Sequence, residues 1–250
     1  MSDIAVRCTG ISKRFFVLQR EKTTFRILKA FIRNKSLKKE YWALRDISFE
    51  LKKSEKLGVV GSNGAGKTTL LRILAGIYRE TSGSLEVAVP PIALFKYWIG
   101  LNNDLSFMDN IYLFGAIQGI ARPILDPQVD NILTAADLFD LKFGPLRELS
   151  TGQRQRLALS VFFRAQGDFL IFDESLSFID KAFYNKCENY FNDLAGSSKT
   201  VIIASHDIPF LRKYCTKAIW LDRGNIRKIG DIDMVADAYE LFCNSPDKSK

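Results

Sequence analysis

The chain has 250 residues, of which 47% are hydrophobic and 26% charged, and its formal net charge is +8. This length and apolar fraction fit one large α/β domain, with or without a sub-domain, and argue against an intrinsically disordered chain. No run approaches the roughly 18 consecutive apolar residues that span a bilayer, and no basic segment followed by an apolar one marks a secretory signal. We therefore expect a protein that stays in the cytoplasm.

Four cysteines are scattered along the chain, without a CxxC pair and without a nearby histidine. They are Cys8, Cys187, Cys215 and Cys243. This pattern argues against a zinc site or a disulfide framework and predicts buried, reduced thiols.

Residues 4–8 and 46–51 alternate apolar and polar side chains, as half-buried strands do. Between them, the segment 18–40 holds eight basic residues against Glu21 and Glu40, so most of the excess positive charge is local. The basic residues are Arg20, Lys22, Arg26, Lys29, Arg33, Lys35, Lys38 and Lys39.

Within this basic insertion, Phe25, Leu28, Phe31 and Ile32 recur at helical spacing, which predicts a basic amphipathic helix. Two interpretations stay open. The helix either packs its apolar stripe on its own domain or lies at a membrane interface, where its basic side chains meet anionic headgroups.

Strands and helices alternate along the rest of the chain. Short apolar runs predict strands at 57–60, 169–172 and 201–204, and helical spacing predicts helices at 104–119, 126–139, 151–164 and 181–194. This alternation implies a mainly parallel sheet, and the mostly helical stretch from about 99 to 166 predicts an inserted sub-domain. We expect one domain over residues 1–242 and a flexible tail at 243–250.

A glycine-rich loop that fits GxxxxGK[ST] follows the first of these strands and precedes a helix. Its glycines let backbone N–H groups turn inward around phosphate oxygens, and the helix N-terminus adds a partial positive charge. Lys67 is expected to reach the β- and γ-phosphates, and the Thr68 hydroxyl is expected to ligate Mg²⁺. The loop consists of Gly61, Ser62, Asn63, Gly64, Ala65, Gly66, Lys67 and Thr68.

Two carboxylates, Asp173 and Glu174, follow the apolar strand at 169–172. At the end of a strand Asp173 can hold Mg²⁺ through water, as in other P-loop enzymes. Glu174 is then placed to act on the attacking water as a general base. Such a pair is commonly a solvated turn, and its significance here comes from following the phosphate loop.

Residues 149–156, Leu-Ser-Thr-Gly-Gln-Arg-Gln-Arg, resemble the signature segment of the ABC (ATP-binding cassette) family, LSGGQ followed by a basic helix. The resemblance implies that Ser150, Thr151, Gly152 and Gln153 bind the γ-phosphate held by the other subunit. Thr151 replaces the family's first glycine, whereas the serine and the second glycine are kept. Ser150 is also a sound helix N-cap, so a plain cap is the alternative.

Further positions match the family more loosely. His206, the single histidine, stands where the family has its switch histidine, which contacts the γ-phosphate and helps hold the attacking water. Asp180 stands where the D-loop aspartate contacts the opposite subunit. Phe15 stands at the position of the aromatic that stacks on adenine, and Tyr41 is its rival because of the insertion.

The family usually has a glutamine that touches Mg²⁺ on the loop entering the helical sub-domain, and residues 100–105 contain none. Asn102 or Asn103 is the candidate replacement, because Gln118 lies too far along and within a predicted helix.

The resemblance covers residues from about 4 to 239 and implies a P-loop NTPase fold of the ABC nucleotide-binding type. That fold has a mainly parallel core sheet, an antiparallel β portion and an inserted helical sub-domain. ATP and Mg²⁺ are the implied cofactors. The implied mechanism is a head-to-tail homodimer in which ATP held at 61–69 of one copy, Thr69 included, is closed over by 150–153 of the other. Hydrolysis then involves Glu174 and His206 together.

The insertion before residues 41–49 and the glutamine-less stretch ending at 105–113, with 115–119 behind it, resemble the branch that exports capsule, O-antigen or teichoic-acid polymers. That resemblance implies a lipid-linked glycan as cargo and separate integral-membrane permease subunits, two being expected. It also implies a peripheral position on the cytoplasmic face of the cytoplasmic membrane.

Two other functions remain open. One is the ATPase of another ABC transporter, for drugs, lipids or small solutes, which the insertion and the missing glutamine disfavour. The other is a soluble ABC protein that acts on ribosomes or DNA. A single cassette without heptads, and basic residues on an amphipathic helix without interleaved stacking aromatics, disfavour it, so no nucleic acid is expected as a partner.

Overall fold

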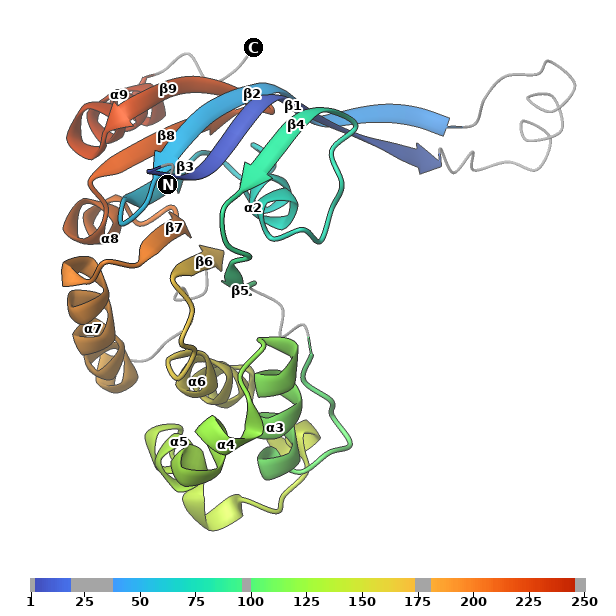
Figure 1. Cartoon of the computed structure of the whole chain (residues 1–250), viewed down its shortest axis with the longest axis vertical. Helices are drawn as coiled ribbons and strands as arrows, with labels where there is room; N and C mark the ends of the chain where they lie inside the picture. The colour runs from blue at the N-terminus through green and yellow to red at the C-terminus, as the bar shows by residue number, and fades with distance from the viewer. Residues whose placement is uncertain (1–2, 19–37, 96–99, 174–180, 246–250) are drawn as a thin grey trace, which may run out of the picture.

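The computed structural model describes residues 3–18, 38–95, 100–173 and 181–245. Figure 1 shows a lobe that contains both sheets and, below it, a lobe of helices. The helical lobe is built from α3 (Phe107–Ile117), α4 (Arg122–Leu125), α5 (Val129–Ala135) and α6 (Thr151–Phe162).

The larger sheet has, within the described residues, six strands in the order β5-β6-β7-β3-β8-β9. Neighbouring strands are parallel except β8 and β9, which are antiparallel. The strands are β3 (Lys56–Val60), β5 (Ile92–Leu94), β6 (Phe169–Asp173), β7 (Thr200–Ala204), β8 (Lys217–Asp222) and β9 (Asn225–Asp231). The three predicted apolar strands are confirmed as β3, β6 and β7, which are buried along their whole length, as expected of parallel strands covered on both faces.

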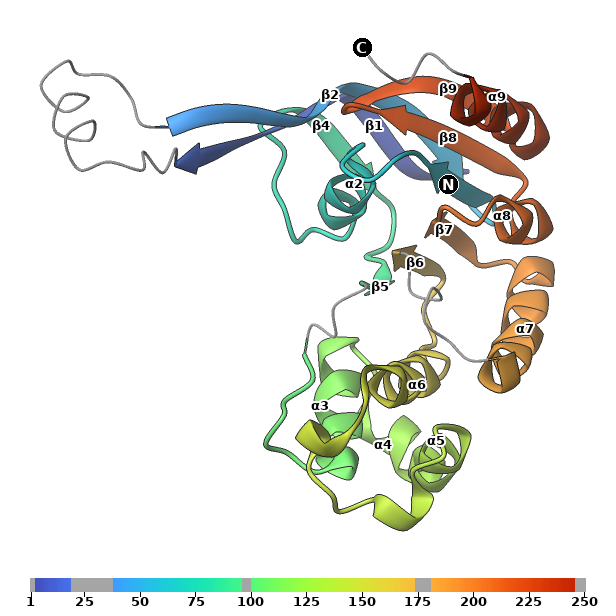
Figure 2. The same ribbon diagram turned by 180° about the vertical axis from the view of Figure 1, so that it is seen from behind.

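The smaller sheet is antiparallel and has the order β2-β1-β4. Its strands are β1 (Ile4–Leu18), β2 (Lys38–Lys52) and β4 (Ser82–Val87). The strands predicted at 4–8 and 46–51 are confirmed but too short, because pairing continues to Leu18 opposite Lys38. Figures 1 and 2 show this end of β1 and β2 running out beyond the lobe. The amphipathic helix predicted around 25–32 falls outside the described residues.

The remaining helices lie in the lobe of the larger sheet or beside it, and the helix predicted at 181–194 is confirmed as α7. These helices are α2 (Lys67–Leu74), α7 (Lys181–Gly196), α8 (Ile208–Tyr214) and α9 (Ile232–Asn244).

The prediction of one helix over 126–139 is wrong. The segment is a 3₁₀ turn η1 (Asp126–Gln128), then α5, then a second 3₁₀ turn η2 (Phe139–Leu141). Pro127 lies within the first turn, and Asp137 ends α5 by adopting a left-handed backbone with φ 59°. A third 3₁₀ turn, η3 (Leu146–Glu148), precedes α6.

Alternate residues of the parallel strands belong to two different hydrophobic cores, one on each face of the sheet. Leu170, Phe172 and Ile203 belong to the core that includes α3 to α9, whereas Ile171 and Ile202 belong to the core that includes α2 and the smaller sheet. Since successive side chains of a strand point to opposite faces, each face of the larger sheet is buried. The ring of Phe162 on α6 packs edge-on against Phe172, with centroids 5.1 Å apart, and so joins the helical lobe to the sheet.

Burial, as predicted, is confirmed for three of the four cysteines: Cys8, Cys187 and Cys215 are buried, and Cys243 on α9 is half-buried. Burial raises the pKa of the Cys8 and Cys215 thiols to about 12, so both stay protonated at neutral pH.

Candidate active site

Three adjacent parallel strands, β6, β7 and β3, end at the same edge of the larger sheet. Ala204, the last residue of β7, lies opposite both Asp173 of β6 and Val59 of β3. The glycine-rich loop follows β3 and His206 follows β7 by two residues. The fold therefore brings the loop, Asp173 and His206, which are far apart in the sequence, to one edge of the sheet.

The glycine-rich loop requires glycine at its two ends. At Gly66, which has φ 110°, an added Cβ would lie 2.7 Å from the carbonyl oxygen of Ala43, and at Gly61 an added Cβ would lie 2.3 Å from that of Leu221. Gly224, the residue before β9, also holds the loop in place, because its N–H donates to the Ala65 carbonyl at 3.0 Å. Neighbouring backbone thus fixes the loop closely.

Lys67 is the first residue of α2 and is buried at 6% exposure. Its ammonium group donates to the carbonyl oxygens of Gly61 at 2.6 Å and Ser62 at 3.3 Å. The charge is therefore held inside the curve of the loop, where the phosphates of a nucleotide are predicted to lie.

A cavity of about 350 Å³ opens over this loop. Its volume lies in the usual range for small-molecule sites. Its lining offers backbone amides, hydroxyl groups and the Lys67 ammonium group, which are groups that bind anions, so the residues present fit a nucleoside triphosphate. The cavity is lined by Tyr41, Ala43, Ser62, Asn63, Gly64, Ala65, Gly66, Lys67, Thr68 and Thr69.

Two aromatic rings compete for the adenine. Phe15 and Tyr41 are opposite partners in the β1–β2 ladder, so both side chains lie on one face of the smaller sheet. Tyr41 is 50% exposed and lines the cavity. Phe15 instead packs edge-on against Tyr78, with centroids 5.6 Å apart, beneath the ammonium group of Lys13. This geometry favours Tyr41 over Phe15.

Oxygen ligands for a divalent cation lie at the same edge. Asp173 is a carboxylate at 3% exposure, and Thr68, which carries a hydroxyl group, lines the cavity. Hard cations such as Mg²⁺ prefer carboxylate and hydroxyl oxygens, so this pair fits the predicted metal. Elsewhere in the described part of the chain, no three histidine, cysteine or carboxylate side chains gather as a metal site.

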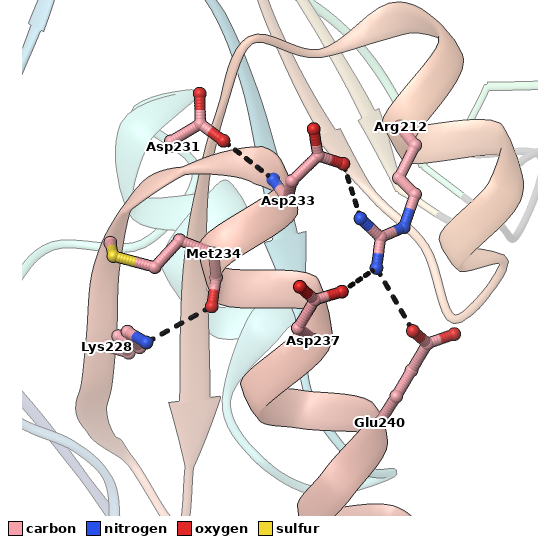
Figure 3. A network of polar contacts seen from close by, with 7 residues as sticks. All are labelled: Arg212, Lys228, Asp231, Asp233, Met234, Asp237 and Glu240. Carbon is pink, nitrogen blue, oxygen red and sulfur yellow. Dashed lines mark hydrogen bonds and ion pairs between the residues drawn. The ribbon is translucent and has the colours of Figure 1, made fainter.

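His206 is exposed on the loop between β7 and α8. The helix behind it is anchored, because Arg212 of α8 pairs with Asp233, Asp237 and Glu240 along one face of α9 (Figure 3). These carboxylates raise the pKa of the Arg212 guanidinium above its ordinary value. The loop that carries His206 therefore leads directly into a helix that these ion pairs hold against α9.

Ser150 to Gln153 begin α6 in the helical lobe (Figure 1). Ser150 is the N-cap: its hydroxyl accepts from Gln153 N–H at 3.3 Å, and its own N–H donates to the Gln153 side chain at 3.0 Å. This capping box orients the segment. The four residues are not among those that line the cavity of the same copy.

Asn102, the predicted stand-in for the missing glutamine, is exposed, and its side-chain oxygen accepts from Asp104 N–H at 2.9 Å. A metal-ligand role has to compete with this turn. Two further predicted site residues, Glu174 and Asp180, lie outside the described residues.

Comparison with known proteins places this arrangement in a family. The family model described as ABC transporter matches residues 44–177, more than half of the chain, and this range contains the glycine-rich loop, Asp173 and Ser150–Gln153. The chain belongs to the ABC transporter family. It carries the nucleotide-binding type of domain that the signature segment predicted.

Several ABC relatives share a name, teichoic acids export ATP-binding protein TagH. The protein of Levilactobacillus brevis is 34% identical over 202 residues, which are 81% of this chain and 56% of that protein. The protein of Listeria innocua is 30% identical over 240 residues, 96% of this chain and 71% of that protein. The Lactococcus lactis protein is 29% identical, and the chain spans 51% of it. The chain thus spans about half the length of several relatives it matches.

Solved ABC structures show the same fold. An ATP-binding subunit of an ABC transporter superposes with a TM-score of 0.70 at 15% identity, covering 95% of this chain and 94% of that one. The ATP-binding cassette MJ0796, solved as a dimer bound to ADP and Pi, also gives 0.70 at 17% identity, covering 91% of this chain and 98% of that one. The predicted fold, with a mainly parallel core sheet, an antiparallel portion and a helical block, is confirmed.

The sequence did not predict two residues that contact this phosphate loop and hold it in place. They are Ala43 of β2 and Gly224. Gly224 belongs to a tight turn between β8 and β9, with Arg223 and Gly224 both at positive φ. The sequence Asp222-Arg223-Gly224-Asn225 signals that turn. Nothing local, however, indicates that the turn contacts the loop more than 150 residues away.

The two candidate aromatics give a first prediction. We expect Tyr41→Ala to weaken ATP binding roughly tenfold, because stacking on a base contributes about 1–3 kcal/mol, whereas Tyr41→Phe retains the ring and the affinity. Phe15→Ala is the matched variant, since it removes the opposite ring of the same ladder and leaves Tyr41 in place. Titration with a fluorescent ATP analogue decides: weaker binding by Phe15→Ala alone would assign the adenine to Phe15.

Proposed function

We propose that the chain is the ATP-hydrolysing motor subunit of an ABC exporter that moves a lipid-linked polysaccharide of the teichoic-acid, O-antigen or capsule type. The observation that carries the ATPase part is the cavity over the glycine-rich loop, with Lys67 inside the loop and Asp173 at the same sheet edge. The cargo rests on the relatives, whose printed names specify teichoic acid export.

In this mechanism, Lys67 and the loop amides bind and orient the β- and γ-phosphates. Thr68 and Asp173 are the residues that hold Mg²⁺, which when bound neutralises negative charge on the phosphates. Glu174 takes a proton from the attacking water, whose oxygen bonds to the γ-phosphorus as the bond to the β–γ bridging oxygen breaks. His206 contacts the γ-phosphate and holds that water.

We further propose that two copies act head to tail. The Ser150–Gln153 segment begins a helix of the helical lobe and does not line the cavity of its own copy, so it is available to close over the nucleotide of a second copy. Asp180 then contacts the opposite subunit. The dimeric MJ0796 cassette, similar in fold, supports the pairing of two copies. Each site is incomplete alone, so ATP binding favours the closed pair of copies.

Transport requires separate membrane subunits in this proposal. Across the described ranges, each helix is too short or too polar to cross a bilayer. We propose that two permease subunits form the path and that the ATPase binds them peripherally at the cytoplasmic face of the cytoplasmic membrane.

The deciding experiment is affinity purification of tagged Glu174→Gln from detergent-solubilised membranes with ATP, followed by protein and lipid mass spectrometry. Without the general base, the closed dimer is expected to persist with its partners. The matched control is the Glu174→Gln/Lys67→Ala double variant, which is expected not to bind ATP.

Recovery of a small polytopic permease with glycan-bearing lipid, in the single variant only, would support polymer export. A permease with a solute-binding protein, or with a drug or simple lipid, would contradict polymer export and leave an ABC transporter ATPase. Ribosomal proteins or nucleic acid would contradict transport.

A further inference from the structure

Arg154 lies in the first turn of α6, directly behind Ser150–Gln153, and its half-buried guanidinium makes three hydrogen bonds. Its Nε donates to the Leu149 carbonyl at 3.0 Å and its Nη2 to the Arg147 carbonyl at 3.2 Å. Its Nη1 donates to the side-chain oxygen of Asn103 at 3.0 Å. One side chain therefore joins the residues that lead into α6 to the linker that enters α3.

The same two segments are joined through their backbones. Arg147 N–H donates to the Asn103 carbonyl at 3.1 Å, and Leu146 N–H donates to the Leu105 carbonyl at 3.0 Å. Ser106 and Pro145 form an antiparallel bridge beside them. Residues 102–106 and 145–149 are thus paired side by side, with Arg154 across one end.

Asn110 of α3 holds the linker, residues 102–106, in place through its side chain. It is fully buried, at 0% exposure, and its side-chain oxygen accepts from Asn102 N–H at 2.7 Å. Its amide group donates to the carbonyls of Asn102, Leu105 and Ser106 at 2.9–3.1 Å. Because a buried amide with all its bonds made is costly to disturb, the linker moves together with the helical lobe.

We infer that Arg154 is a positioning residue that locks the Ser150–Gln153 segment to the linker 102–106, and so holds Ser150–Gln153 in the orientation that meets the nucleotide of the second copy. This inference rests on the proposed function, because it takes Ser150–Gln153 to act across the dimer. Only arginine carries donors in a planar fork that can bond two carbonyls and an amide at once. The capping box supplies hydrogen bonds to Ser150 itself. Arg154 instead holds the backbone before Ser150 through the carbonyls of Arg147 and Leu149.

The first test compares homodimers. Arg154→Gln removes the charge and the fork, and we expect ATP turnover to fall roughly ten- to a hundredfold, the effect of misplacing a reacting group by about 1 Å. Arg122→Gln is the matched control. Arg122 is an exposed arginine of the same lobe, paired with Asp126 at 3.4 Å, and its replacement is expected to leave turnover within about twofold of wild type. Asn103→Ala, which removes one of the three acceptors, is expected to cause a smaller loss without threatening the fold.

The second test shows which of the two composite nucleotide sites of the dimer carries the Arg154→Gln defect. In a mixed dimer of one Arg154→Gln copy and one Lys67→Ala copy, carrying different tags, both defects fall in the same composite site if Arg154 acts through Ser150–Gln153. The other composite site keeps an intact loop and an intact signature segment. We expect this mixed dimer to retain as much turnover as the calibrating dimer of Ser150→Ala with Lys67→Ala, and more than either homodimer.

Turnover in the mixed dimer as low as in the two homodimers would overturn the inference, because Arg154 would then act on the nucleotide of its own copy or on folding. Arg154→Gln turnover equal to that of Arg122→Gln would also overturn it. If instead the Ser150→Ala homodimer is fully active, or its calibrating dimer is no better than its homodimers, the proposed head-to-tail function fails and the inference falls with it.

Discussion

Replacing Lys67 with methionine is expected to lower kcat/KM for ATP hydrolysis by roughly 10²–10³-fold, the loss typical of removing one charge-stabilising donor from an active site. The ammonium group already lies within the loop, 2.6 Å from the Gly61 carbonyl. Methionine keeps an unbranched stem of similar shape, so the packing at the start of α2 is retained. The Gly61 and Ser62 carbonyls lose their donor, so the free energy of unfolding is expected to fall by about 1–3 kcal/mol, as in the control variant below. Steady-state ATPase assays and thermal melts of the same preparations measure both parts of the prediction.

Lys56 is the matched control for Lys67. Both side chains are 6% exposed and donate to backbone carbonyls, and the two residues lie near opposite ends of β3. Lys56 donates to Ser54 at 3.0 Å and Ser197 at 2.6 Å, at the edge away from the cavity. Lys56→Met is expected to lower the free energy of unfolding by about 1–3 kcal/mol, because two carbonyls lose their partner, with kcat/KM unchanged. Equal activity losses in both variants, each with a lowered melting temperature, would mean that Lys67 is structural.

The motifs at strand ends could be predicted because their chemistry is local. The glycines of the loop at 61–66 and the carboxylate at Asp173 are specified by immediate neighbours, and apolar runs identify β3, β6 and β7. Once these strands are parallel and adjacent, their carboxyl ends must share an edge.

Contacts between distant segments could not be predicted. The choice of Tyr41 over Phe15 depends on which ring faces the loop after pairing of strands 15 residues long, and no local pattern encodes it. The same holds for Arg154, whose partner Asn103 is 51 residues away. The prediction of one helix over 126–139 failed because the helical spacing of apolar residues was given more weight than the break signals at Pro127 and at Asp137, whose backbone is left-handed.

Replacing Asp173 with asparagine is expected to raise the Mg²⁺ concentration needed for half-maximal ATPase activity by roughly 10–100-fold, the usual cost of weakening a metal site through one carboxylate. Asparagine keeps the size of the buried side chain, at 3% exposure, and removes its charge. Binding of ATP measured without Mg²⁺ is expected to stay unchanged, because Lys67 and the loop amides are intact. Titration of Mg²⁺ at saturating ATP is the measurement.

Asp168 supplies the control, since it is an exposed carboxylate immediately before β6, whereas Asp173 is the last residue of that five-residue strand. The backbone carbonyl of Asp168 accepts from Thr200 N–H at 2.8 Å, a bond that Asp168→Asn leaves in place. We expect Asp168→Asn to follow the wild-type Mg²⁺ titration. An unshifted titration for Asp173→Asn would refute the metal role, and a shift in both variants would point to the net charge of the domain. Since the two aspartates lie at opposite ends of β6, the pair separates a metal site at the cavity edge from the general effect of removing a carboxylate.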